Sequence, residues 1–370
     1  MRKVKIQCTI GPACNDPQTL GDMLDAGMEV ARINLSHGSA ASQKDKLENF
    51  RAAADARGKL EAAIMYDLRG PEIRVCDLPG GSVKVWKDQT LVLCCEDPRS
   101  DGEADGLYSD SLYEDAFDSR YGGFADNRIA INYPRLCEEV QTGSQILIDD
   151  GKVSMNVESV SDSEIICYVD RGGVIASRKG INVPGVKLQM DYLSDGDKED
   201  LLWCIDHGAD YIAGSFIRRA DDVQAIRDFL DANGGHYIGI IAKIECLEAI
   251  QNFEEIAKSA DQILIARGDL GVEIGFEKVP AMQKRLIRKS RQLGKAVIIA
   301  TQLIESMTDH LIPTRAEVSD IANAVFDGAT DLLVTGETAS GEYPVEVVRT
   351  MAKIMEQAEE DMDRYGEALR

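Results

Sequence analysis

The sequence predicts an α/β protein, namely a (β/α)8 (TIM) barrel with a small antiparallel β-barrel domain inserted after the third strand. Eight short apolar runs rich in Val, Ile and Ala recur along the 370 residues, and all but one of the intervals between them fit one helix with two loops. The exception runs from Leu68 to about Asp210 and is richer in Gly, Asp and Ser. The repeat predicts the barrel, and the change in composition predicts the insertion.

The apolar runs are continuous rather than alternating, which is typical of parallel strands with both faces covered. They span Val4–Ile10, Val30–Leu35, Ala62–Asp67, Tyr211–Phe216, Ile238–Ile244, Gln262–Ala266, Ala296–Ala300 and Leu332–Thr335. The last run precedes a helical pattern over Val345–Glu359. Eight strand–helix repeats favour a closed barrel over an open sheet.

Segments of alternating character divide the long interval and predict short antiparallel strands. They span Ser82–Trp86, Gln89–Cys95, Gln145–Ile148, Val153–Val160 and Glu164–Val169. Gly70-Pro71 and Gly180–Pro184 are rich in helix and strand breakers and are the expected hinges. We therefore expect residues 1–70 and 180–370 to form the barrel and 71–179 the insert. Barrel chemistry lies at the carboxyl ends of the strands, so an insert hinged there is expected to act as a lid.

Composition excludes several classes of protein. The formal net charge of −23 repels nucleic acid and anionic membranes, so neither is an expected partner. The basic run from Lys284 to Arg291 is interpreted as one solvated helix face. No apolar stretch approaches 18 residues, and the N-terminus resembles a strand rather than a signal segment. Nine cysteines without a Cys-x-x-Cys motif favour reduced thiols and a cytoplasmic location.

Charged residues follow two consecutive strands. Lys243 and Glu245 are two positions apart, so they project to the same side of a strand, and Asp269 follows the next strand. A cation beside two carboxylates suits a divalent metal bound against an anionic, phosphorylated substrate. The alternative is a pair of surface ion pairs where the loops begin.

Other predicted strands also end in polar residues. Arg32, Asn34 and Ser36 alternate, so all three face one way and would make a site for phosphate and a cation. The alternative is a loop in which Ser36 caps the next helix. Further strands end in Asp67, in Thr301-Gln302 and in Thr335-Gly336-Glu337-Thr338. Six strands that bring such groups to one rim indicate a shared active site.

These residues belong to motifs that closely resemble those of the pyruvate kinases, in the same order from residue 3 to about 360. The motifs are Thr9–Ala13, Ala31–Gly38, Gly70–Arg74, Asp149–Gly151, Lys179–Gly185, Ser215–Arg218, Lys243–Glu245, Ala266–Gly271, Ala300–Gln302, Glu305–Met307, Pro313–Glu317 and Gly336–Ala339. The resemblance implies phosphoryl transfer from phosphoenolpyruvate to ADP, which gives pyruvate and ATP.

The resemblance also implies roles for the substrate-side residues. Lys243 would stabilise the transferring phosphoryl group together with Arg32, while Glu245 and Asp269 would hold Mg²⁺ or Mn²⁺. The backbone of Ala266, Arg267 and Gly268 and the hydroxyl of Thr301 would bind the substrate carboxylate. Glu337 is a candidate for the relay that protonates the enolate near Thr301, with a structural role as the alternative.

The nucleotide and K⁺ sites are implied in the same way. The matching nucleotide residues are Arg32, Asn34, His37, Arg74, Asp150 and Lys179. The matching K⁺ ligands are the side chains of Asn34, Ser36 and Asp67 and the backbone carbonyl of Leu68. The chain departs from the family at Leu68-Arg69, where Thr-Lys is usual, and at Val75, where threonine is usual. A carbonyl ligand is available from any residue, so K⁺ stays an expected cofactor.

Family members usually continue into an α/β regulatory domain beyond the eighth helix, whereas this sequence reaches Arg370 in an acidic segment. We therefore expect a short form without that domain, not activated by fructose bisphosphate or AMP, and forming a homodimer. Two other functions stay open. One is a non-catalytic paralogue that binds phosphoenolpyruvate or nucleotide, and the other is a Mg²⁺-dependent lyase acting on pyruvate enolate. The second would have no need of the inserted domain.

Overall fold

A computed structural model describes residues 2–36, 38, 40–95, 117–118, 123–124 and 127–366. The chain forms two compact units. The first contains residues 1–71, 191–271 and 276–370, and the second contains residues 72–190 with the short segment 272–275. Each unit is described separately below.

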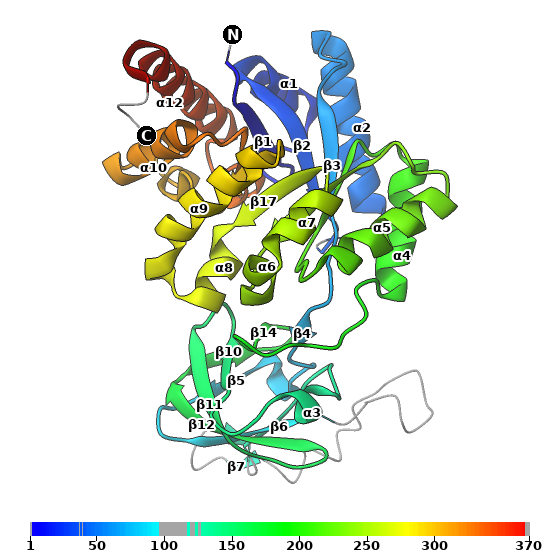
Figure 1. The fold of residues 1–370 in the computed structure, drawn as a ribbon, viewed down its shortest axis with the longest axis vertical. Helices are drawn as coiled ribbons and strands as arrows, with labels where there is room; N and C mark the ends of the chain where they lie inside the picture. Colours follow the sequence, from blue (N-terminus) through cyan, green and yellow to red (C-terminus); the bar gives the residue numbers. More distant parts are fainter. Residues whose placement is uncertain are drawn as a thin grey trace. The chain divides into compact units, whose positions relative to one another are not determined.

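The first unit is the predicted closed barrel of eight parallel strands, which confirms the fold class (Figure 1). In barrel order the strands are β1 (Lys5–Thr9), β19 (Asp331–Val334), β18 (Ala296–Ala300), β17 (Gln262–Ala266), β16 (Gly239–Ile244), β15 (Tyr211–Gly214), β3 (Ala63–Asp67) and β2 (Met28–Asn34). All eight coincide with the predicted apolar runs to within one or two residues.

Helices surround this barrel on the outside (Figure 1). They are α1 (Pro17–Ala26), α2 (Ala40–Arg57), α4 (Asp195–Asp206), α5 (Ala220–Ala232), α6 (Leu247–Gln251), α7 (Phe253–Ser259), α8 (Arg267–Ile274), α9 (Val279–Gln292), α10 (Arg315–Asp327), α11 (Gly336–Ala339) and α12 (Pro344–Tyr365). Several begin with a side-chain cap that accepts a backbone N–H. Asp16 caps α1, and full capping boxes begin α4 and α10 at Ser194 and Thr314.

An apolar cluster fills the middle of the barrel. It consists of Val30, Met65, Ala213, Ile241, Leu264, Ala266, Ile298, Ala300 and Leu333. Two residues further along β2, β3 and β16 come Arg32, Asp67 and Lys243. Because a strand returns to the same face every second residue, these three charged groups stand above the apolar layer at the carboxyl end. The packed core therefore supports the predicted site from below.

The second unit is built around a seven-stranded sheet of mostly antiparallel pairs. Its strand order is β4 (Ile73–Arg74), β14 (Gly180–Asn182), β10 (Gln145–Ile148), β11 (Val153–Val160), β12 (Glu164–Arg171), β6 (Thr90–Cys94) and β9 (Arg128–Ala130). The β6–β9 pair is parallel. A bridge between Val75 and Ile131 links the chain after β4 to the chain after β9 and joins the two edges of the sheet. The second unit also holds two two-stranded antiparallel sheets, one of β5 (Ser82–Val85) with β13 (Gly173–Ala176) and one of β7 (Phe117–Asp118) with β8 (Gly123–Phe124). It contains the short helix α3 (Leu136–Glu139) as well.

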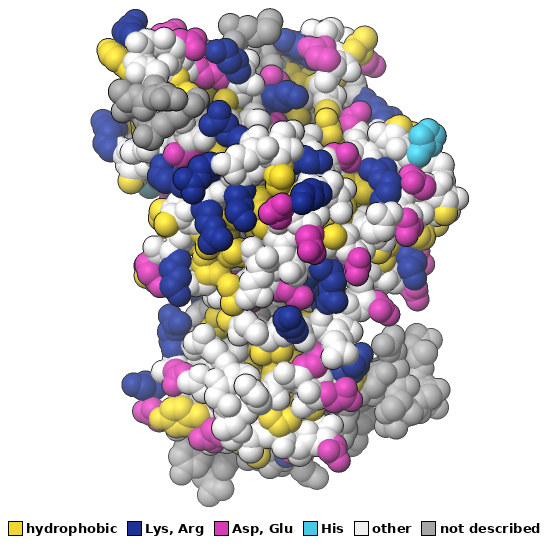
Figure 2. Space-filling view, viewed as in Figure 1, with side chains coloured by type: hydrophobic (Ala, Val, Ile, Leu, Met, Phe, Trp, Pro, Cys, Tyr) yellow, Lys and Arg dark blue, Asp and Glu magenta, His cyan; other side chains and the backbone are white. Residues whose placement is uncertain are grey.

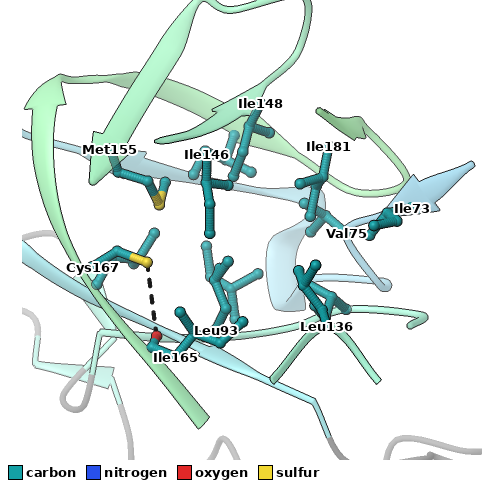
Figure 3. Packing of buried hydrophobic residues seen from close by; sticks show 14 of the residues in the cluster. Ile73, Val75, Leu93, Leu136, Ile146, Ile148, Met155, Ile165, Cys167 and Ile181 are labelled. Atoms are coloured by element: carbon teal, nitrogen blue, oxygen red, sulfur yellow. Dashed lines mark hydrogen bonds between the residues drawn. The ribbon is translucent and has the colours of Figure 1, made fainter. Parts of the chain in front are cut away.

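This unit has a hydrophobic core of its own, which Figure 3 shows from close by. Side chains from opposite strands converge there, including Leu93, Ile146 and Ile181, and all three are buried. Met155 and Cys167 complete one side of the cluster (Figure 3). The alternating pattern of the sequence predicted this inward face.

The second boundary of the insert differs from the expected one at residues 179 and 180, since it lies after Met190. The reason is hydrogen bonding and packing. Gly180–Asn182 is not a hinge but strand β14, which pairs with β10 and β4. Val186, Leu188 and Met190 then pack against the core of the second unit. The first boundary, Pro71, lies beside the expected Gly70-Pro71.

The basic run lies on α9, where Lys284, Arg285 and Arg288 are exposed while Leu286 and Ile287 are buried. Dark blue side chains gather over this helix in Figure 2. The structure therefore agrees with a solvated helix face. Among the described residues no helix is both long and apolar enough to span a membrane.

Candidate active site

Lys243 stands at the centre of the charged groups above the barrel core. It lies near the end of β16, and its Nζ is 3.0 Å from Glu245 Oε1 and 3.2 Å from Asp67 Oδ1. It also donates a hydrogen bond of 2.7 Å to the hydroxyl of Ser215, which follows β15. Burial opposes the charge of this lysine, but Asp67 and Glu245 outweigh burial and hold its pKa above the ordinary value. Lys243 is therefore a fixed positive charge.

Asp67 links Lys243 to Arg32. Its Oδ2 accepts hydrogen bonds from Nε and Nη2 of Arg32 at 2.8 and 2.5 Å, and its Oδ1 faces Lys243. Burial would raise the pKa of Asp67, but the two cations outweigh it and lower that pKa. Arg32 Nη1 also donates to the hydroxyl of Thr9 at the end of β1. Two cations thus share one buried carboxylate, and their combined charge exceeds that of Asp67.

The pair predicted to hold a divalent metal, Glu245 and Asp269, lies beside this group. Glu245 is 1% exposed, and its Oε2 accepts a hydrogen bond of 2.6 Å from the backbone N–H of Phe216. Burial, together with the nearby carboxylate of Asp269, raises the pKa of Glu245 to about 7, although Lys243 acts to lower it. A divalent cation would relieve this repulsion, so the two oxygen donors fit Mg²⁺ or Mn²⁺.

Among the described residues no group of three or more His, Cys, Asp or Glu side chains could hold a metal ion by itself. A site built on Glu245 and Asp269 would need further ligands from water or substrate. That arrangement is typical of Mg²⁺ held by one or two carboxylates and a substrate phosphate.

The predicted K⁺ ligands come from the ends of two neighbouring strands. Asn34 and Asp67 are direct register partners on β2 and β3. The carbonyl of Leu68 accepts a hydrogen bond of 2.7 Å from the hydroxyl of Ser215. Asn34 Oδ1 accepts a hydrogen bond of 2.9 Å from the backbone N–H of Ser36, and Ser36 is exposed. These are hard oxygen donors and fit an alkali cation, although Asp67 already contacts two cationic side chains.

The helix α8 begins directly at the end of β17. Ala266 is the last strand residue, and Arg267, Gly268 and Asp269 form the first helical turn, whose backbone N–H groups have no acceptor within the helix. A Cβ added to Gly268 would lie 3.0 Å from Cγ2 of Thr301. The turn and Thr301 therefore approach each other closely, and the N–H groups suit an anion such as a carboxylate.

Arg267 uses its side chain differently, to hold the turn that carries Thr301. Its guanidinium donates to the carbonyl of Thr301 at 2.6 Å and to that of Gln302 at 3.1 Å, and it pairs with Asp320 at 2.6 Å. Thr301 and Gln302 have positive φ angles of 77° and 53°, which is rare for residues other than glycine. The contact to Arg267 explains how this strained turn is kept in place.

Glu337 lies in α11, just after β19, and is 2% exposed. Its Oε2 accepts from the backbone N–H of Thr335 at 2.8 Å, and its Oε1 accepts from that of Ile304 at 3.4 Å. Both carboxylate oxygens of Glu337 thus accept hydrogen bonds from backbone N–H groups. These contacts favour the structural alternative for this residue over a role in a proton relay.

The remaining predicted nucleotide residues belong to the second unit or lie outside the described residues. Lys179 pairs with Asp149 at 2.8 Å, and Arg74 pairs with Glu72 and donates to the carbonyl of Arg178. Asp150 is an exposed residue of the turn between β10 and β11, with a positive φ of 55°. His37 lies outside the described residues.

Two further side chains, not among the residues predicted from the sequence, belong to the cluster. Ser215 stands between Lys243 and Asp67, and Thr9 contacts Arg32. The sequence could have indicated both as site residues, because Thr9 and Ser215 are polar residues at the ends of apolar strands, as Asp67 and Thr301 are. The structure thus brings Arg32, Asp67, Lys243 and Glu245 together on one rim.

A closed (β/α)8 barrel with an inserted β unit and a cluster of basic and acidic side chains on the carboxyl rim defines the class of barrel proteins whose site lies at the carboxyl ends of the strands. Comparison with known proteins narrows the class. The family model for the barrel domain of pyruvate kinase matches residues 1–348. The chain belongs to the pyruvate kinase family.

Individual relatives agree with this assignment. The chain is 42% identical over 364 residues to a pyruvate kinase of Geobacillus stearothermophilus, covering 98% of this chain and 58% of the relative. It is 38% identical over 370 residues to a pyruvate kinase of Clostridium perfringens, of which it covers 73%. A crystal structure of a pyruvate kinase from Cryptosporidium parvum aligns with a TM-score of 0.86 and 38% identity, over 97% of this chain and 70% of that one. The chain thus spans little more than half the length of some relatives.

Proposed function

We propose that the chain catalyses phosphoryl transfer from phosphoenolpyruvate to ADP, which gives pyruvate and ATP. In this reaction the bond between phosphorus and the enol oxygen breaks, a bond forms from phosphorus to a terminal oxygen of ADP, and the enolate gains a proton at carbon. The observation that carries the proposal is Lys243, whose side chain is 12% exposed and whose ammonium is held by Asp67, Glu245 and Ser215.

Each part of the barrel site would then have one task. Lys243 and Arg32 neutralise charge on the phosphoryl oxygens as it develops, and because both are already fixed by Asp67 they need no reorganisation. The first turn of α8 and the hydroxyl of Thr301 bind and orient the substrate carboxylate. Mg²⁺ or Mn²⁺ on Glu245 and Asp269 would supply Lewis-acid stabilisation of the phosphoryl oxygens.

The nucleotide and K⁺ are further parts of the proposal. Arg32 and Asn34 on the barrel, with Arg74, Asp150 and Lys179 on the second unit, are the residues proposed to bind ADP. K⁺ would be held by Asn34, Ser36, Asp67 and the carbonyl of Leu68. Its support is the oxygen donor set at the ends of β2 and β3.

A coupled assay of pyruvate formation tests the proposal, with Mg²⁺ and with or without K⁺. Lys243→Met should lower turnover on the order of 10³-fold or more, because it removes a charge from the transferring group. The matched control is Lys284→Met, since Lys284 is an exposed lysine that pairs with Asp327 on α10. Near-normal turnover of Lys243→Met would refute the assigned role. Binding of phosphoenolpyruvate without any turnover in the unaltered chain would favour the non-catalytic paralogue.

A further inference from the structure

One peptide group just after β15, the group between Ser215 and Phe216, is held at both of its polar atoms. Its N–H donates a hydrogen bond of 2.6 Å to Oε2 of Glu245, and its carbonyl oxygen accepts one of 2.9 Å from the hydroxyl of Tyr192. A trans peptide group is planar, and its C=O and N–H point in opposite directions. The hydroxyl that fixes the carbonyl oxygen therefore also fixes the direction of the N–H.

The backbone at this peptide group is strained and needs to be held. Phe216 has a φ angle of 52°, in the left-handed region that bulky residues rarely adopt. Such a conformation persists only where its surroundings fix it. The hydroxyl of Ser215 accepts a hydrogen bond of 2.7 Å from Lys243 and lies 3.0 Å from Oδ1 of Asp67. Rotation of the peptide group would therefore take the N–H away from Glu245 and disturb the charged cluster.

Tyr192 is placed and protonated so as to be a constant donor. It lies two residues past Met190, where the second unit ends, and its residue is 6% exposed. Gly214 leaves room for its hydroxyl, because a Cβ at that position would lie 2.6 Å from Oη of Tyr192. Burial, reinforced by nearby carboxylates such as Asp222, raises the pKa of Tyr192 well above its ordinary value. The hydroxyl therefore keeps its proton and donates to the carbonyl of Ser215.

We propose that Tyr192 is a positioning residue of the divalent-cation site, because its hydroxyl fixes the peptide group whose N–H holds the carboxylate of Glu245. The inference rests on the proposed function, since the cation is the Mg²⁺ or Mn²⁺ assigned there to Glu245 and Asp269. Residues that orient metal ligands without touching the metal contribute to its affinity. The alternative is a packing role alone, in which case loss of the hydroxyl would lower the stability of the fold and leave the affinity for the cation unchanged.

Electron paramagnetic resonance of free Mn²⁺, titrated with the whole chain in the absence of substrate, measures the affinity directly. Tyr192→Phe keeps the ring and removes the hydroxyl, and it should weaken Mn²⁺ binding about tenfold. In the pyruvate assay the activation constant for Mg²⁺ should rise by the same factor. The matched control is Tyr133→Phe in the second unit, which removes another buried hydroxyl, one that donates to Glu139 at 2.7 Å. It should leave the affinity for Mn²⁺ unchanged.

Gly214→Ala displaces the same hydroxyl by another route. It should weaken Mn²⁺ binding to a similar degree, and it should add little to Tyr192→Phe, in which the hydroxyl is already absent. Thermal unfolding identifies the variants that fold, and should Tyr192→Phe fail to fold, Gly214→Ala decides. Unchanged Mn²⁺ affinity in the folded variant, or an equal loss in Tyr133→Phe, would overturn the inference and leave the proposed function intact. Absence of Mn²⁺ binding and of turnover in the unaltered chain would refute the proposed function, and the inference with it.

Discussion

A single side chain, Asp67, balances the two cations of the candidate site. It is 1% exposed, and both Arg32 and Lys243 lie within hydrogen-bond distance of its oxygens. Charges brought out of water are costly unless they are paired, so the arrangement is stable only as a set. The sequence placed Asp67 among the expected K⁺ ligands, and the structure adds that it contacts Arg32 and Lys243, the side chains proposed to bind the phosphoryl group.

Asp67→Asn tests this role because it keeps the shape and removes the charge. We expect the free energy of unfolding to fall by about 3–5 kcal/mol, since two cations whose side chains are only 11% and 12% exposed lose their counter-charge. Urea denaturation followed by Trp203 fluorescence in a Trp86→Phe background measures the loss. The control is Asp363→Asn, whose partner Lys3 is 71% exposed, and it should cost less than about 1 kcal/mol. Equal small losses in both variants would contradict the assignment.

Asp331, at the other end of the barrel, predicts a pH dependence of stability. Burial raises its pKa above the ordinary value, against hydrogen bonds from Thr330 and Gln7 that lower it. The folded chain therefore holds this proton more tightly than the unfolded chain does. Its contribution to stability is greatest below the ordinary pKa of about 4 and is lost as the pH rises from there through the raised pKa.

Asp331→Asn removes this titration. The free energy of unfolding of the variant relative to the unaltered chain should therefore rise with pH from about 4 upward and then level off. Urea denaturation at a series of pH values measures the difference. A difference that stays constant, or that falls as the pH rises, would show that the carboxyl of Asp331 titrates normally in the fold.

At the scale of elements, the turn after β18 depends on a side chain from the start of α8. Arg267 holds the carbonyls of Thr301 and Gln302, whose backbone lies in the left-handed region, and anchors them to Asp320 on α10. One guanidinium thus ties three elements together, which an ammonium cannot do with the same geometry.

Arg267→Lys should accordingly lower the free energy of unfolding by about 1–3 kcal/mol, because the carbonyls of Thr301 and Gln302 lose charge-assisted hydrogen bonds. It should also reduce kcat/KM for phosphoenolpyruvate, since the backbone turn that carries Thr301 is no longer held by Arg267. Arg285→Lys on the exposed face of α9 is the control. If kcat/KM is unchanged although stability falls, Arg267 has a structural role alone.

The barrel elements could be predicted because each strand is a continuous apolar run followed by a helical pattern, and the spacing of Lys243 and Glu245 predicted that they face the same side. Short elements were harder. β4, β9 and β14 contain two or three residues each, too few for a period to appear. The sequence therefore suggested a hinge at Gly180–Pro184, where pairing with β10 and β4 makes a strand. The contacts of Ser215 and Glu337 depend on tertiary neighbours that no local pattern reveals.

At the scale of the whole molecule, the chain divides into two units with separate hydrophobic clusters. Its two tryptophans are divided between them, because Trp203 lies on α4 of the barrel and Trp86 follows β5 in the second unit. Trp203 stacks on His207 and packs edge-on against Tyr66, so its fluorescence reports on the barrel. Each unit therefore carries its own optical probe.

Because each unit has its own hydrophobic core, a substitution that creates a cavity in one core should destabilise only that unit. Ile146→Ala in the second cluster should lower the stability of that unit by about 2–5 kcal/mol. In a Trp203→Phe background the Trp86 transition should move to lower urea, whereas in a Trp86→Phe background the Trp203 transition should stay in place. Ile298→Ala in the barrel cluster is the matched control and should show the reverse. If both probes shift together in both variants, the chain unfolds as one cooperative unit, and the division into two units has no thermodynamic counterpart.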